Sequence, residues 1–119
     1  MDSERTGRTV LIVEDATRIR MLVRAILAET GWTLLEASSA EEALAINSAV
    51  DLLLTDLRLP GMNGLDLAQE LRRRNPKLKV LCMSGVLLPV ATHDDIHFIE
   101  KPFQPQTLLD KARELLGGV

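Results

Sequence analysis

Short apolar runs alternate along the chain with longer stretches in which apolar residues recur every three or four positions. The short runs, rich in leucine and β-branched residues, predict strands, and the longer spacing predicts amphipathic helices. Five strands are expected, at residues 9–13, 33–37, 52–55, 79–83 and 97–99. This alternation is typical of βα units arranged around a parallel sheet.

The predicted strands differ in how continuous their apolar runs are. The first, third and fourth are almost wholly apolar, which predicts that helices cover both faces of the sheet around them. The second strand carries Glu36 near its end, and we therefore expect it to lie at an edge of the sheet.

The predicted helices have recognisable start and stop signals. The first helix ends at Gly31, and Trp32 just beyond it is expected to be a partly exposed packing residue. The second opens with Ser39 as its N-cap and Glu42 three residues later, a capping-box arrangement. The last helix begins at Pro105, because proline is favoured in a first helical turn.

The remaining helices are less evenly marked. The third is expected over about residues 65–74. Between Gly85 and Ile96 the signal is weakest, because the apolar part of this stretch contains Pro89 and the rest is polar. The fourth helix is therefore expected to be short or irregular.

Polar residues stand at the ends of four of the five predicted strands. They are Glu14 and Asp15 after the first strand, Asp56 after the third, Ser84 after the fourth and Lys101 after the fifth. Because the carboxyl ends of parallel strands meet at one rim of a sheet, we expect these side chains to converge there. A single aspartate after a strand most often caps a helix or forms a turn. The combination of four strand ends instead predicts a functional site.

The residue types at this rim predict a metal ion. Carboxylates brought together raise one another's pKa unless a cation neutralises them. Oxygen ligands without a nearby histidine or cysteine favour Mg²⁺, which keeps waters that a phosphate group can displace. Asp56 would then be the nucleophile for a phosphoryl group. Lys101 is a compact positive charge suited to a phosphoryl oxygen, and Ser84 can donate a hydrogen bond to the same group.

Composition and charge narrow the partners and the location. The chain has 119 residues, of which 46% are hydrophobic and 26% are charged, as in a globular domain. A formal net charge of −3 gives no broad attraction to nucleic acid, and no apolar run is long enough to cross a membrane. Cys82 is the single cysteine, so an intramolecular disulfide is impossible and a reducing cytoplasm is expected.

Four motifs give the sequence a specific resemblance. They are the pair Glu14-Asp15, the segment Leu-Thr-Asp-Leu-Arg-Leu-Pro-Gly-Met-Asn-Gly at 54–64, the pair Ser84-Gly85, and Lys101-Pro102-Phe103. In this order and on these strands, they make residues 9–116 similar to the receiver domain of two-component response regulators. The resemblance implies a flavodoxin-like, doubly wound α/β fold with five parallel strands in the order 2-1-3-4-5. We expect residues 1–119 to form one such domain, with 1–8 and 117–119 flexible.

The resemblance also implies roles around the site. Asp56 matches the family's phosphoacceptor, which also contacts the metal, and Asp15 matches its direct metal ligand. Glu14 matches the second acidic position, which usually acts through a water, and the backbone carbonyl of Arg58 matches the third protein contact to Mg²⁺. Lys101 matches the residue that pairs with the phosphoryl group. The bond from Lys101 to the proline after it is commonly cis in this family.

Two further residues match the family's switch. Ser84 occupies its hydroxyl position and Phe98 its aromatic position, and the ring is expected to turn inward when the hydroxyl moves toward the phosphoryl group. Simple packing is the alternative role for Phe98. Only 16 residues separate Ser84 from Lys101, fewer than in most receivers. The compact connection is similar to that of receivers attached to hybrid sensor kinases, and a single-domain regulator is the other type considered.

The resemblance predicts a signalling switch, not an enzyme. It would accept a phosphoryl group on Asp56 from a histidine kinase or a histidine phosphotransfer protein, lose that group slowly, and act on a downstream protein. One alternative is a Mg²⁺-dependent aspartyl-phosphate hydrolase of the haloacid-dehalogenase type, but such enzymes place a second aspartate where this chain has Arg58. The other alternative is a receiver-like interaction module that takes no phosphate. The residues that phosphorylation would need are all present, which argues against it: Asp15, Asp56, Ser84 and Lys101.

Overall fold

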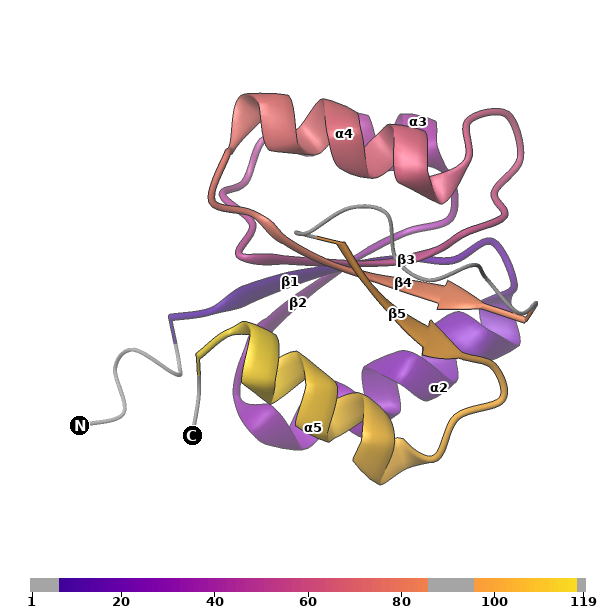
Figure 1. Cartoon of the computed structure of the whole chain (residues 1–119), viewed down its shortest axis with the longest axis vertical. Coiled ribbons are helices and arrows are strands. Elements are labelled where there is room, and N and C mark those ends of the chain that lie inside the picture. The colour runs from indigo at the N-terminus through magenta and orange to yellow at the C-terminus, as the bar shows by residue number, and fades with distance from the viewer. Residues whose placement is uncertain (1–6, 86–95, 118–119) are drawn as a thin grey trace.

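The computed structural model describes residues 7–85 and 96–117, in which five parallel strands form one sheet (Figure 1). The strand order is β2-β1-β3-β4-β5, and every neighbouring pair is parallel. The strands are β1 Thr9–Val13, β2 Thr33–Ala37, β3 Leu52–Asp56, β4 Lys79–Ser84 and β5 Ile96–Glu100. The predicted fold class and strand order are confirmed, with the apolar strands in the middle and β2 at an edge.

Helices cover both faces of the sheet (Figure 1). The helices α2 (Thr17–Leu27) and α5 (Pro105–Leu115) lie on one face, and α3 (Ala40–Leu44) and α4 (Gly64–Arg74) lie on the other. A short 3-10 helix, η1 (Ala28–Thr30), follows α2 directly. Because successive strand residues point to opposite faces, the sheet separates two apolar cores.

We call these the α2/α5 core and the α3/α4 core. Buried members of the α2/α5 core include Val10, Ile12, Leu27, Leu54, Met83 and Leu108. Buried members of the α3/α4 core include Leu11, Val13, Leu53, Leu67, Val80 and Cys82. The thiol of Cys82 is buried as expected, and this burial raises its pKa to about 12.

The ends of α2 and α3 follow local sequence signals. Gly31, which follows η1, adopts φ of 84°, a left-handed conformation that glycine allows at little cost. Ser39 caps α3, because its Oγ accepts a hydrogen bond from the Glu42 amide at 3.1 Å. In the predicted capping box, the Glu42 carboxylate would also accept a hydrogen bond from the Ser39 amide, but the structure shows a different donor. The Glu42 carboxylate accepts from the amide of Ser38 at 2.7 Å, one residue earlier than the N-cap.

Three other expectations are corrected by the structure. Trp32 is only 8% exposed and belongs to the α2/α5 core, so it is not a partly exposed residue. Asp56 and Ser84 are the last residues of β3 and β4, because strand pairing continues one residue further than the apolar runs. β5 is likewise longer than predicted at both ends. The short or irregular fourth helix, expected within 86–95, lies outside the described residues.

The described helices are all short. None of those between residues 7 and 85 or 96 and 117 has the length and apolar content needed to cross a membrane.

Candidate functional site

The carboxyl ends of β1, β3, β4 and β5 bring the predicted polar residues to one rim of the sheet. Asp56 ends β3 and Ser84 ends β4, and both are buried. Lys101 follows β5, and its amide donates to the carbonyl oxygen of Ser84 at 2.7 Å, which extends the strand pairing to the lysine. The predicted convergence is therefore present among the described residues.

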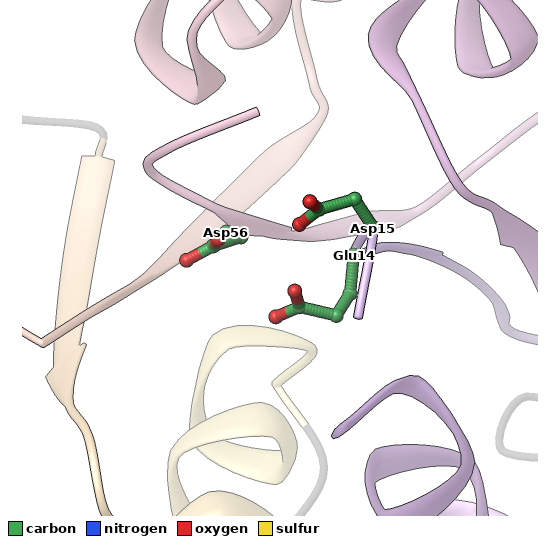
Figure 2. A group of neighbouring side chains, drawn as sticks. All are labelled: Glu14, Asp15 and Asp56. Carbon is green, nitrogen blue, oxygen red and sulfur yellow. The ribbon is translucent and has the colours of Figure 1, made fainter. Parts of the chain in front are cut away.

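Three carboxylates form the centre of this site. Glu14, Asp15 and Asp56 each offer an oxygen, and these oxygens lie within 4.8 Å of one another. Figure 2 shows that the two neighbouring residues Glu14 and Asp15 both direct their carboxylates toward the side on which Asp56 lies. Glu14 is 1% exposed and Asp56 is 8% exposed, whereas Asp15 is open to solvent. Two of the three negative charges are thus removed from water, which requires nearby positive charge.

Lys101 supplies that positive charge. Its Nζ lies 3.0 Å from Glu14 Oε1 and 3.0 Å from Asp56 Oδ1, and its side chain is 19% exposed. Partial burial by itself lowers the pKa of Lys101, but hydrogen bonds to Glu14 and Asp56 outweigh this effect and leave the pKa raised. The ammonium is therefore charged over the whole range in which the protein would be assayed. The bond between Lys101 and Pro102 is cis, as the resemblance implied.

Glu14 is the most deeply enclosed of the acidic residues. Burial raises the pKa of its carboxyl group, an effect that hydrogen bonds from Lys101 and from the amide of Ala16 reduce but do not cancel. Its Oε1 accepts from Lys101 at 3.0 Å, and its Oε2 accepts from the Ala16 amide at 3.1 Å. Both carboxylate oxygens of Glu14 therefore already have protein donors.

The segment after β3 is folded back onto the end of that strand. The amide of Leu57 donates to the carbonyl of Met83 at 2.9 Å, and the amide of Gly64 donates to the carbonyl of Leu57 at 2.8 Å. A Cβ atom at Gly64 would collide with the backbone carbonyl oxygen of Asp56. Glycine is therefore needed at this position for the start of α4 to approach the residue that carries the central carboxylate.

The N-terminus of α4 differs by one residue from the prediction. Asn63 is its N-cap, because its side-chain oxygen accepts from the Asp66 amide at 2.8 Å. The helix consequently begins at Gly64 and not at about residue 65.

Two further predicted residues are also located, Phe98 of the switch and Arg58 of the metal site. Phe98 is half-buried on β5 and packs against the α3/α4 core. The side chain of Arg58 is exposed, and the expected contact of its backbone carbonyl with Mg²⁺ stays a prediction.

Two residues with a place in the site were not singled out from the sequence. Gly64 was visible only as the last residue of the 54–64 motif. The signal that could have found it is the residue type itself, because glycine allows a close approach of two backbone segments. Arg20 donates from Nη1 to the carbonyl oxygen of Glu14 at 2.7 Å. As a charged residue on an amphipathic helix, it gave no local signal, because its partner lies six residues earlier.

Comparison with known proteins places this fold and site in one family. The sequence pattern of the response regulator receiver domain matches residues 10–113. The chain is 34% identical over 128 residues to the transcriptional regulatory protein AruR of Pseudomonas aeruginosa, in an alignment that covers 92% of this chain and 50% of AruR. The chain spans half of AruR and a smaller share of several other curated relatives.

Solved structures agree with this assignment. A CheY-like receiver domain protein from Methanospirillum hungatei JF-1 superposes with a TM-score of 0.84 at 30% identity, covering 93% of this chain and 94% of that one. The response regulator TrrA from Thermotoga maritima, in complex with Mg²⁺-BeF, superposes with a TM-score of 0.80 at 27% identity, covering 91% and 98%. The chain belongs to the response regulator receiver family. Its function class is accordingly that of a phosphoacceptor signalling switch.

Proposed function

We propose that Asp56 is the phosphoacceptor of this receiver and that it accepts a phosphoryl group while Mg²⁺ is bound beside it. The observation that carries the proposal is the position of the Asp56 carboxylate, which lies next to Lys101 and within 4.8 Å of the other two carboxylates. Phosphoryl transfer depends on positioning of the nucleophile and on neighbouring positive charge more than on an acid or base. The relative TrrA, solved with Mg²⁺-BeF, supports the same reading.

The donor set fits Mg²⁺. All three side chains offer oxygen, and Mg²⁺ binds oxygen at about 2.0–2.1 Å in octahedral geometry. Neighbouring octahedral ligands at that distance are about 3 Å apart, and the spacing here, within 4.8 Å, leaves room for one carboxylate to bind the ion through a water. Asp15 and Asp56 would contact it directly, Glu14 through a water, and the carbonyl of Arg58 would be the third protein contact. The bound ion would neutralise charge on the transferring phosphoryl group.

The residues of the chain would perform the transfer by positioning and charge. An oxygen of Asp56 attacks the phosphorus of a phosphorylated histidine on the donor, so that a P–O bond forms as the P–N bond breaks. The electron pair of the broken bond stays on the imidazole nitrogen, which takes a proton. Lys101 would release Asp56 and bind a phosphoryl oxygen, and the hydroxyl of Ser84 would donate to another.

Movement of Ser84 and Lys101 would carry the signal from the site to the surface. Ser84 and Lys101 are joined by a backbone hydrogen bond between β4 and β5, and Phe98 lies on β5 three residues before the lysine. A shift of the hydroxyl toward the phosphoryl group would favour a packing in which the Phe98 ring turns inward. Such a population shift requires only that phosphate contacts are better in one packing than in the other.

The phosphodonor would be a histidine kinase or a histidine phosphotransfer protein. Two exposed apolar side chains on α2 support a protein donor: Met21 is 62% exposed and Leu22 is 52% exposed. They directly follow Arg20, which contacts the backbone of Glu14. Exposed apolar patches beside a site commonly mark protein contacts. Nucleic acid is not proposed as a direct partner, and a cytoplasmic location stays a prediction.

We propose no catalytic turnover beyond slow loss of the phosphoryl group. A hydrolase of the alternative type would use an acid or base two residues after Asp56, and the residue there is Arg58, whose side chain is exposed. A module that takes no phosphate would not require the contacts of Lys101 with both Glu14 and Asp56.

The test compares wild type with Asp56→Asn, a nearly isosteric change. Each is incubated with acetyl phosphate and Mg²⁺, and the adduct is followed by intact mass and by loss on hydroxylamine treatment. We expect one phosphoryl group on wild type, none in EDTA and none on Asp56→Asn. A modification that persists in Asp56→Asn would sink the assignment, and rapid release of many equivalents of phosphate would favour the hydrolase.

A further inference from the structure

The turn between β1 and α2 carries two of the three carboxylates, and Arg20 of α2 reaches back to it. Arg20 Nη1 donates to the carbonyl oxygen of Glu14 at 2.7 Å. On its other side the guanidinium is held by Glu36 of β2, at 3.3 Å from Nε to Oε1. The Arg20 side chain is 18% exposed, so these bonds form in a partly desolvated position. One side chain thus ties together a helix, the end of β1 and the neighbouring edge strand.

We propose that Arg20 is a positioning residue for the metal site, a role that rests on the function proposed above. The carbonyl of Glu14 and the Cα of Asp15 belong to one planar peptide unit. A hydrogen bond that holds this carbonyl therefore fixes the plane from which the Asp15 backbone continues and restricts the directions open to the Asp15 side chain. Asp15 is exposed and has no buried surroundings to orient it, so the backbone must do so.

The other restraints on this turn either lie outside the peptide between Glu14 and Asp15 or depend on the acidic site itself. The amide of Glu14 donates to the carbonyl of Ala37 at 3.1 Å, which fixes the entry to the turn but not the peptide after it. The amide of Ala16 is bound by Glu14 Oε2, and the same carboxylate binds Lys101. That carboxylate must adjust when a cation enters or when Lys101 leaves. Arg20 holds the peptide without using a carboxylate of the site, so the turn keeps its shape while the site changes.

Arg24 offers a matched control on the same helix. It binds the second oxygen of Glu36, with Nη1 to Oε2 at 2.7 Å, and it is 52% exposed. Removing any cation near a Mg²⁺ site strengthens binding electrostatically, which opposes the loss of positioning. Arg24→Gln reports this charge effect and the loss of a Glu36 contact, while the bond to the Glu14 carbonyl stays in place.

The experiment measures the Mg²⁺ dissociation constant by titration calorimetry for wild type, Arg20→Gln, Arg20→Lys and Arg24→Gln. Outer-shell substitutions cost about tenfold or more in metal affinity. We expect Arg20→Gln to bind Mg²⁺ about tenfold more weakly than Arg24→Gln, which should stay within about twofold of wild type. Arg20→Lys should be intermediate, because an ammonium can donate to the carbonyl but cannot bridge to Glu36 as a guanidinium does.

Urea titrations in EDTA separate this role from a general effect on folding. All variants must be compared at a temperature where each is folded, and Arg20→Lys provides the comparison if Arg20→Gln is not. Equal affinities for Arg24→Gln and the folded Arg20 variants would overturn the positioning role alone, even if their stabilities differ. A wild-type protein that binds no Mg²⁺ would overturn the proposed function and this inference together.

Discussion

Replacing Lys101 by methionine should strengthen Mg²⁺ binding while it weakens the metal-free fold. In the structure the ammonium occupies the place of a cation, at 3.0 Å from both Glu14 and Asp56. Mg²⁺ must therefore compete with a charge that the protein already supplies. Methionine keeps most of the length of the side chain and removes that charge.

The size of both effects follows from the geometry. A unit charge about 5 Å from a divalent ion costs about 1.7 kcal/mol even at the dielectric constant of bulk water. That value is a lower limit, because the Lys101 side chain is only 19% exposed and the effective dielectric constant around it is below that of water. Losing this repulsion should tighten Mg²⁺ binding by at least about tenfold. Without metal, the buried carboxylate of Glu14 loses its cation, and the free energy of unfolding should fall by about 2–3 kcal/mol.

Calorimetric Mg²⁺ titration at pH 8 and urea unfolding with and without Mg²⁺ test both parts. Lys77→Met is the matched control, because it removes an exposed lysine beyond the end of α4. Added Mg²⁺ should recover much of the stability that Lys101→Met loses in EDTA. If Lys101→Met binds Mg²⁺ no more tightly than wild type, while Lys77→Met is unchanged, the ammonium is not acting as an internal counter-ion.

Three further predictions concern the close packing, the pH response and the donor surface. Gly64→Ala should lower the free energy of unfolding by about 1–3 kcal/mol and weaken Mg²⁺ binding, because the new Cβ would collide with the Asp56 carbonyl. Gly85 has open space around it, so Gly85→Ala should change neither the free energy of unfolding nor Mg²⁺ binding in the same urea and calorimetry assays. Because burial raises the pKa of Glu14 above 4.5, the metal-free folded state binds a proton more tightly than the unfolded chain. Urea unfolding in EDTA should therefore show stability falling as the pH rises above 4.5, and a Glu14→Gln variant with an unchanged pH profile would contradict this. Replacing Met21 and Leu22 together by serine should slow phosphotransfer from a histidine-containing donor protein at least several-fold. The rate with acetyl phosphate should stay unchanged, because only the protein donor needs the apolar surface. Equal slowing with both donors would show that the substitutions act on the phosphorylation site and not on donor binding.

The sequence predicted the parts of this protein that have a local or repeated signature. The strands and the rim of polar residues followed from the apolar runs and from the residues after them, whereas the strand order followed only from the resemblance to receiver domains. The cap at Ser39 was also visible, because the signal and its partner lie three residues apart.

What the sequence did not predict depends on contacts between distant segments. Trp32 follows a helix-ending glycine, which suggested exposure, but its ring is drawn into the α2/α5 core. The strand ends at Asp56 and Ser84 were missed because polar residues rarely continue a buried strand, and here each is paired by the neighbouring backbone. The link from Arg20 to Glu14 is of the same kind, since no periodicity marks a bond from a helix to the carbonyl of a preceding turn.

The separation of the two cores by the sheet bears on how this receiver can diverge in evolution. Val23 and the exposed pair Met21 and Leu22 belong to α2, on the α2/α5 face, whereas Phe98 packs on the opposite face. Under the proposed function, substitutions of Met21 or Leu22 that alter donor recognition would disturb different neighbours from substitutions of Phe98 that alter the output, and their effects on stability should add to within about 0.5 kcal/mol. A duplicated copy could acquire a new input while it keeps its old output, or the reverse, without repacking both layers at once.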